Sequence, residues 1–237
     1  MSPNCWLKSV ATWVKLWLGA QSIAWQTAIS WLAGVGNPKE SNPLIIGVLA
    51  LQGDFREHRA ALKKLGIESR EVKANQDLVG LDGLIIPGGE STTMGKLMVD
   101  YGMMEPLQDF AKKHATWGTC AGAIMLSKDS GRPQPLLGLM DCDTTRNAFG
   151  RQVDSFEIEI PVPFLEPAKP DYHLTFIRGP IFSRIYGKAK GLLQLPDGKV
   201  VAAQDGHLLG TSFHPELTDD LRFHRYFVEM VKRTRAN

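Results

Sequence analysis

The stretch "ATWGTCAGAIMLSK" (residues 115–128) decides the fold. Its first six residues predict a short buried strand, and the residues after Cys120 predict a helix over 121–128. Gly118 and Gly122 flank the cysteine, and a nucleophile held between glycines where a strand turns into a helix is the arrangement of a nucleophile elbow. A free cysteine is also a common core residue, so this stretch alone leaves open whether Cys120 is a nucleophile or a packed side chain.

Outward from this turn, apolar runs of strand length alternate with segments of helical periodicity. The expected strands before the elbow are 44–51, 68–73 and 81–87. The expected helices are 55–66, ending at Gly66, then 92–113, interrupted near Gly102 and Pro106, and 221–233. Further strands are expected at 155–162, at 175–182 and within 192–214, with turns at 196–198 and 205–206. This alternation predicts an α/β fold of three layers, with an open, mostly parallel sheet and helices on both faces.

The composition limits the function classes. The chain has 237 residues, 43% of them hydrophobic and 22% charged, which suits a globular protein with a large core. A formal net charge of +2 and no block of basic residues argue against nucleic-acid binding. The three cysteines have no metal-ligand spacing, and so sparse and odd a count fits a reducing cytoplasm. No metal and no cofactor are expected.

The first 43 residues differ from the rest. They hold five of the six tryptophans, some of which fall at the spacing of one helix face: Trp6, Trp13 and Trp17. Polar residues interrupt every long apolar run, so we predict neither a transmembrane span nor a signal peptide. We expect 1–43 to be a poorly ordered extension or a misassigned start of translation, with a membrane-surface or partner-binding helix as the alternative. The segment 36–43 predicts a linker, and 44–237 a single domain.

Two further stretches lie where ligands bind in open α/β sheets, at the carboxyl ends of strands. "PGGES" (87–91) follows the strand 81–87, and its adjacent glycines would let a substrate approach the backbone. "SFHPE" (212–216) places His214 at a strand end with Glu216 two positions later, as a relay of cysteine, histidine and carboxylate requires. Taken singly, neither stretch excludes a structural alternative: an ordinary glycine turn for the first and a surface His-Pro turn for the second. The other histidines are expected to be structural or solvated, and Cys142 to be a packing residue.

In this order, the three stretches resemble the class I, triad-type glutamine amidotransferases, which have a flavodoxin-like fold. More narrowly, the chain is similar to the glutaminase subunits of pyridoxal 5′-phosphate synthases. The resemblance is carried by "IGVLALQGDFREH" (46–58), "GLIIPGGESTTM" (83–94), "GTCAG" (118–122), "RNAFGRQVDSFE" (146–157), "FIRGP" (176–180) and "GTSFHPELTDD" (210–220). It covers about 44–233, and Gly179 stands where alanine is more usual.

The resemblance implies that Cys120 attacks the side-chain amide of glutamine, that His214 transfers protons and that Glu216 orients His214. It implies an oxyanion hole formed by the backbone N–H groups of Gly89 and Ala121. The implied glutamine contacts are Gly89, Glu90, Ser91, Arg146, Ile177 and Arg178. An arginine suits the α-carboxylate of the substrate and a carboxylate such as Glu90 its α-ammonium group, although the sequence does not pair them.

The resemblance also implies a partner. The ammonia from L-glutamine would pass to a separate (β/α)8 synthase subunit for pyridoxal 5′-phosphate (vitamin B6) biosynthesis, in a synthase dodecamer carrying up to twelve glutaminases. The isolated chain is expected to be weakly active. Two other functions are weighed against this one. The stretches "LALQGD" and "RNAFGRQ" argue against a glutaminase of another pathway, such as histidine biosynthesis, and the intact triad argues against a non-catalytic binding or regulatory module.

Overall fold

The computed structural model describes residues 43–146, 148–149 and 155–236. The strands are β1 (Ile45–Leu49), β2 (Glu68–Val72), β3 (Gly83–Ile86), β4 (Ala115–Thr119), β5 (Ser127–Asp129), β6 (Met140–Thr145), β7 (Ser155–Ile160), β8 (Tyr172–Ile177), β9 (Ile181–Ile185), β10 (Lys190–Gln194), β11 (Val200–Asp205) and β12 (Leu208–Thr211). The helices are α2 (Phe55–Lys64), η2 (Asn75–Leu78), α3 (Ser91–Asp100), α4 (Met104–Ala111), α5 (Ala121–Leu126), η3 (Pro215–Leu217) and α6 (Arg222–Ala236). Apart from Pro43, the predicted extension 1–43 lies outside the described residues, so its organisation stays a prediction.

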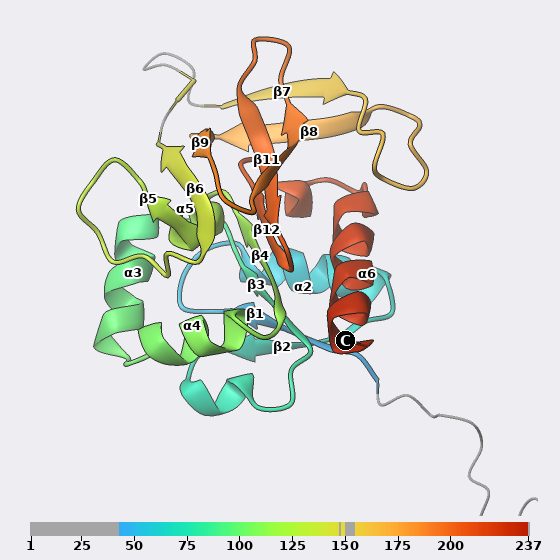
Figure 1. Ribbon diagram of the computed structural model, residues 1–237. Helices are drawn as coiled ribbons and strands as arrows, with labels where there is room; N and C mark the ends of the chain where they lie inside the picture. Colours follow the sequence, from blue (N-terminus) through green and yellow to red (C-terminus); the bar gives the residue numbers. More distant parts are fainter. Residues whose placement is uncertain (1–42, 147, 150–154, 237) are drawn as a thin grey trace, which may run out of the picture. The chain divides into compact units, whose positions relative to one another are not determined.

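A ten-stranded sheet forms the centre of the described domain (Figure 1). Its order is β2-β1-β3-β4-β12-β11-β9-β6-β5, with β10 beside β11. The first five strands are parallel, and Trp117 of β4 pairs with Ile85 of β3 on one side and Leu209 of β12 on the other. The strands β11, β9 and β6 then continue the sheet antiparallel. The loops after β1, β3, β4 and β12 therefore meet at one edge of the parallel half.

Two hydrophobic cores cover the two faces of this sheet. One core contains Leu62 of α2, Phe227 of α6 and Trp117, together with the aromatic residues of β8, which pairs with β7 in a separate two-stranded sheet. The other contains Met98 of α3, Leu107 of α4 and side chains of α5. Helices thus lie on both faces (Figure 1), which confirms the predicted three-layer α/β fold. In the described part of the chain, every helix is too short or too polar to cross a membrane.

Local details differ from the sequence-based expectations. The helices α3 and α4 are separated at Gly102, which has a φ of +62°, as predicted. Pro106 does not interrupt a helix but lies in the first turn of α4, where the N–H that proline lacks would have no intrahelical acceptor. The expected helix over 121–128 ends at Leu126, because the next residues form β5 beside β6. The expected strand 175–182 is two strands, β8 and β9.

Candidate active site

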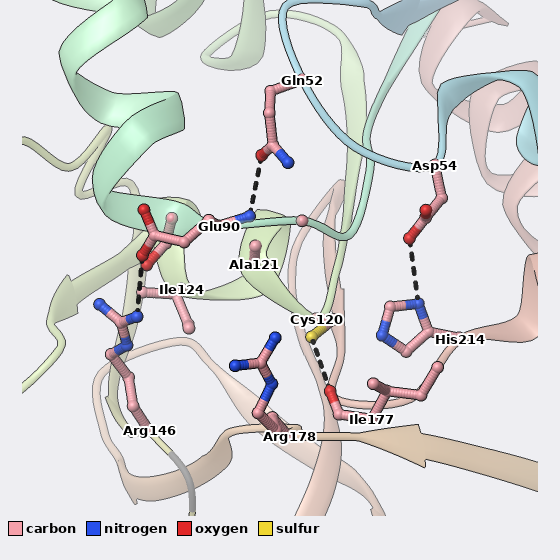
Figure 2. Close-up of a pocket in the computed structure, with 12 residues that line it drawn as sticks. Gln52, Asp54, Glu90, Cys120, Ala121, Ile124, Arg146, Ile177, Arg178 and His214 are labelled. Atoms are coloured by element: carbon pink, nitrogen blue, oxygen red, sulfur yellow. Dashed lines mark hydrogen bonds and ion pairs between the residues drawn. The ribbon is translucent and has the colours of Figure 1, made fainter. Parts of the chain in front are cut away.

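A cavity of about 380 Å³ opens at the carboxyl ends of the parallel strands (Figure 2). The loops after β1, β3, β4 and β12 contribute to its wall, together with residues after β6 and β8. The lining residues are Gln52, Asp54, Gly89, Glu90, Ser91, Cys120, Ala121, Ile124, Arg146, Ile177, Arg178 and His214. Except for Glu216, which lies behind His214, every site residue predicted from the sequence lines this cavity.

Cys120 occupies a strained turn between β4 and α5. Its φ of 46° and ψ of −102° are unfavourable for a residue with a side chain, and its N–H donates to the Thr211 carbonyl at 2.7 Å. The backbone can close this tightly because a Cβ on Gly118 would overlap the backbone of Gly122. The Cys120 Sγ faces the cavity, 3.8 Å from the Ile177 carbonyl oxygen. The turn therefore has the geometry of the predicted nucleophile elbow.

His214 and Glu216 form the pair expected from their spacing. The Nδ1 of His214 lies 2.7 Å from the Oε1 of Glu216, and both side chains are buried. Burial alone would lower the pKa of His214, but its interactions with Cys120 and Glu216 raise that pKa to about 10. The ring faces Cys120 in Figure 2, and among the described residues its Nε2 has no hydrogen-bond partner of regular geometry. His214 is thus protonated at neutral pH, with Nε2 directed toward the sulfur.

A second carboxylate, Asp54, lies beside the same imidazole. Its Oδ2 is 3.5 Å from His214 Nδ1, and burial raises the pKa of Asp54. The atoms of Asp54, His214 and Glu216 are also the single group of side chains in the described residues that could hold a metal ion. Glu216 already accepts the hydrogen bond of His214, so the contacts favour a proton relay over metal ligands. The absence of a metal stays a prediction.

The residues of the expected oxyanion hole, Gly89 and Ala121, line the same cavity as Cys120. Ala121 is the first residue of α5, so its N–H has no acceptor within the helix. Gly89 has a φ of +150°, and a Cβ there would overlap the side chain of Gln52. Gln52 holds this loop through its Oε1, which accepts from the N–H of Glu90 at 2.8 Å. The loop after β1 thereby fixes the backbone of the loop after β3.

Glu90 and Arg146 contact each other. Glu90 is the N-cap of α3, and its carboxylate accepts from the N–H groups of Thr92 and Thr93 and from the Thr93 hydroxyl. Arg146 Nη2 donates to the same carboxylate at 3.0 Å, while its Nη1 donates to Thr92 and Gln134. Burial opposes ionisation, but these hydrogen bonds lower the pKa of Glu90 to about 2. Four donors occupy the roughly four lone-pair positions of a carboxylate.

The remaining predicted glutamine contacts, Arg178, Ile177 and Ser91, differ in what surrounds them. Arg178 has a φ of 46° and lines the cavity, and among the described residues its guanidinium forms no ion pair (Figure 2). Ile177 presents its carbonyl toward Cys120. Ser91 is buried at the start of α3, where its hydroxyl bonds to the Gln134 side chain.

Several residues around the site were not singled out in the sequence. Gln52 and Asp54 fall in the stretch "LALQGD" (49–54). Their position directly after a buried strand is the sequence signal that could have identified them as site residues. His58 and His224, expected to be structural or solvated, lie fully buried behind Glu216. No local spacing connects them, because they are 166 residues apart in the chain. Cys142 is fully buried, as predicted, and burial raises its pKa to about 12.

Comparisons with known proteins agree with this geometry. The model of the SNO glutamine amidotransferase family matches residues 48–233. A protein named pyridoxal 5′-phosphate synthase subunit PdxT from Moorella thermoacetica is 49% identical over 188 residues, which cover 78% of this chain and 98% of that protein. A PdxT from Thermus thermophilus is 52% identical over 191 residues, covering 79% of this chain and 97% of the other.

Solved structures show the same relationship. A crystal structure of a glutamine amidotransferase superposes with a TM-score of 0.73 at 49% identity, covering 79% of this chain and 98% of that one. The structure of PurLQS from Thermotoga maritima shares the fold alone, with a TM-score of 0.59 at 14% identity over 81% of this chain and 98% of that one. The family model matches most of the chain, and the relatives are about 50% identical to it over nearly their own full length. Both findings place the chain in one family. The protein belongs to the SNO glutamine amidotransferase family.

Proposed function

We propose that this protein hydrolyses L-glutamine to L-glutamate and ammonia as the glutaminase subunit of a pyridoxal 5′-phosphate synthase. The observation that carries the proposal is the shared cavity of Cys120 and His214, with His214 held by Glu216 at 2.7 Å. A cavity of about 380 Å³ is of the size that small-molecule ligands occupy. Close relatives carry the name of that synthase subunit.

The proposed reaction starts with the Cys120 thiolate and the protonated His214. The sulfur attacks the amide carbon of glutamine, and the carbonyl oxygen takes up the negative charge, stabilised by the N–H groups of Gly89 and Ala121. The C–N bond then breaks, and His214 gives its proton to the departing nitrogen, so ammonia leaves and a thioester remains. Neutral His214 next takes a proton from water, whose oxygen displaces the sulfur and releases glutamate. Glu216 stabilises the imidazolium whenever His214 is protonated.

The contacts suggest how the substrate is oriented. The Glu90 carboxylate is already occupied by four donors, and Arg146 is one of them. We therefore assign the α-carboxylate of glutamine to Arg178, whose guanidinium lines the cavity and is not paired with any described residue. Glu90 and Ser91 would then contribute through the backbone of their loop, and Arg146 through the position of Glu90.

The ammonia would be consumed by a (β/α)8 synthase subunit, in a dodecamer that carries up to twelve glutaminases. Relatives named as subunits of a pyridoxal 5′-phosphate synthase support a partner subunit, whose fold and stoichiometry rest on the family resemblance. We place the complex in the cytoplasm, because a catalytic thiolate must stay reduced.

The test is glutamate release from L-glutamine by the full chain, with and without the synthase subunit. Wild-type protein is expected to be stimulated by the partner, and Cys120→Ala to lose glutamate release entirely. Cys142→Ala, which removes a buried thiol on β6 outside the cavity, is the matched control and should retain activity. Equal release by Cys120→Ala and wild type would refute the mechanism, and stimulation by a histidine-biosynthesis cyclase alone would refute the pathway.

A further inference from the structure

Two buried histidines stand behind the proposed relay and take no part in the mechanism above. His58 comes from α2 and His224 from α6, and both side chains are fully buried. The Nδ1 of His58 lies 3.0 Å from the Nε2 of His224. On its other side, the Nε2 of His58 lies 3.0 Å from the Thr119 hydroxyl and 3.3 Å from Glu216 Oε2. His224, His58 and Glu216 therefore form a line that ends on the carboxylate that orients His214, with Thr119 beside its last step.

The unpartnered atoms of this line determine where its protons lie. Burial lowers the pKa of His224 to about 3, and burial together with His224 and His214 holds the pKa of His58 well below its usual value. Both rings are therefore neutral, and each carries one N–H. Among the described residues, His224 Nδ1 and Glu216 Oε2 are both buried without a hydrogen-bond partner of regular geometry, and the His58 Nε2 atom lies 3.3 Å from that oxygen.

Only one arrangement of the two protons avoids a buried, unsatisfied donor. If His58 donated from Nδ1 to His224, the proton of His224 would sit on its unpartnered Nδ1, and the lone pair of His58 Nε2 would face the Glu216 carboxylate. The opposite arrangement leaves only an acceptor unsatisfied at His224, which is less costly than a buried orphan N–H. His224 then donates from Nε2 to His58, and His58 donates from Nε2 toward Thr119 and Glu216.

We propose that His224 and His58 form a directed hydrogen-bond chain whose last N–H, shared with the Thr119 hydroxyl, is aimed at the otherwise unpartnered Glu216 Oε2 and so holds the other carboxylate oxygen on His214. His58 is then a positioning residue of the glutaminase, and this role rests on the function proposed above. The imidazole rings of His58 and His224 both pack against the indole of Trp117 in T-shaped contacts, with ring centroids 5.5 and 5.0 Å apart. The indole N–H of Trp117 donates to the Thr211 hydroxyl at 3.0 Å. This packing keeps the rings in line with the carboxylate.

The chain matters because Glu216 is buried, and burial raises its pKa. The titratable groups that face this region are Asp54 from the loop after β1, Cys120 after β4, and His214 and His224. His214 stabilises one oxygen of the carboxylate and His58 the other. Loss of the His58 N–H should raise the pKa of Glu216 further, so that activity is lost at a higher pH as the solution is acidified.

The proton positions can be tested directly in the full-length wild-type protein. Two-bond ¹H–¹⁵N NMR spectra distinguish the two neutral tautomers of a histidine from its protonated form. We expect His58 and His224 to carry their proton on Nε2 across the pH range in which a free histidine titrates. A proton on Nδ1 of His58, or titration of either ring in this range, would overturn the proposal. This result does not depend on glutamine hydrolysis, so it stands apart from the proposed function.

A pair of variants tests the effect on the reaction. His58→Gln places an amide N–H₂ near the position of Nε2, whereas His58→Asn can replace only Nδ1. With the synthase subunit present, His58→Asn should lower kcat by about ten- to a hundredfold, the range for a hydrogen bond to a charged group, with little change in KM. The acidic limb of the pH–activity profile of His58→Asn should move to higher pH. His58→Gln should restore most of kcat and the wild-type limb.

The control is His207→Asn, at a half-buried histidine whose Nε2 bonds to the Ala111 carbonyl at 2.8 Å, outside the cavity. It should reduce stability without moving the pH profile. Equal losses in His58→Gln and His58→Asn with an unchanged pH limb would show that His58 only packs, and would refute the proposal. If wild-type protein releases no glutamate, the proposed function fails, while the NMR result still decides the direction of the chain. If either variant fails to fold, the tautomers in the wild type decide alone.

Discussion

Substitution of Gly88 by alanine should disable the proposed active site by displacing one imidazole ring. Gly88 lies in the turn after β3, and a Cβ built there would sit 2.5 Å from His214 Cε1 and 3.0 Å from its Nδ1. Gly88 is not among the residues with a positive φ, so alanine adds no backbone strain. The perturbation is therefore steric, and it acts mainly on His214, with a weaker contact to Asp54, whose Oδ2 would lie 3.1 Å from the new Cβ.

The geometry gives its magnitude. Carbon atoms in contact are about 3.5 Å apart at the closest, so the His214 ring must retreat by about 1 Å. The ring cannot do so freely, because it is buried and its Nδ1 is hydrogen-bonded to Glu216 at 2.7 Å. A misplacement of about 1 Å costs an enzyme on the order of a hundredfold in rate. We expect kcat to fall by about a hundredfold with a much smaller change in KM.

The assay is glutamate release in the presence of the synthase subunit, with thermal unfolding measured in parallel. Gly191→Ala is the matched control, because its Cβ would meet only Val200 and Ile185 side chains, with a closest distance of 3.3 Å, outside the cavity. That variant should keep its activity. A folded Gly88→Ala protein with wild-type kcat would show that the position of His214 does not limit the reaction, and would refute the reasoning.

Three further predictions concern the cavity, pH and the second thiol. Arg178→Ala should raise the KM for glutamine by about tenfold or more, which is the scale of one charge-assisted hydrogen bond. Arg146→Ala should raise the KM less and should lower the stability of the N-terminus of α3, where Arg146 holds Glu90. Steady-state kinetics measure the KM values, and thermal unfolding measures the stability. The pKa of His214 is about 10 in the folded protein and about 6.5 in the unfolded chain, so the stability that His214 contributes is complete below about pH 6.5 and is lost as the pH rises toward 10. The free energy of unfolding, measured in urea, should therefore fall more steeply over this pH range in the wild type than in His214→Asn. Iodoacetamide at pH 8 should modify Cys120 and spare Cys142, whose pKa burial raises to about 12, as peptide mass spectrometry would show.

The parts of the fold that were predictable are those with local signals. Continuous apolar runs identified β1 and β3, and Gly102 separated α3 from α4, because each signal lies within the element that it marks. The strands β5 and β6 were not predicted, since β5 has three residues and forms by pairing with β6 rather than from its own pattern. Pro106 misled for a related reason: whether a proline breaks a helix depends on its position in the first turn, which the surrounding residues did not reveal.

The same division applies to the site. Cys120 stands between two glycines and His214 two residues before Glu216, so their chemistry could be predicted from spacing within a few residues. The pairing of Glu90 with Arg146 could not, because the two are 56 residues apart and the sequence does not show that the Glu90 carboxylate caps α3. Family resemblance predicts that both contact the substrate, whereas the geometry shows that they contact each other.

The pKa shifts of His214 and Glu216 have one physical explanation. Burial raises the pKa of Glu216 and would lower that of His214, and these effects favour a neutral pair, which could not protonate the departing nitrogen in the proposed reaction. The proton remains on the imidazole because its interactions with Cys120 and with the Glu216 carboxylate both favour the cation, which requires that Glu216 stay ionised in a buried position. Glu216 Oε1 is held by His214, whereas Oε2 has no hydrogen bond of regular geometry to any described residue and lies 3.3 Å from the Nε2 atom of His58, the donor that we propose for it. In the proposed reaction, the acid strength of His214 therefore depends on α2 and α6, neither of which contributes a residue to the lining of the cavity.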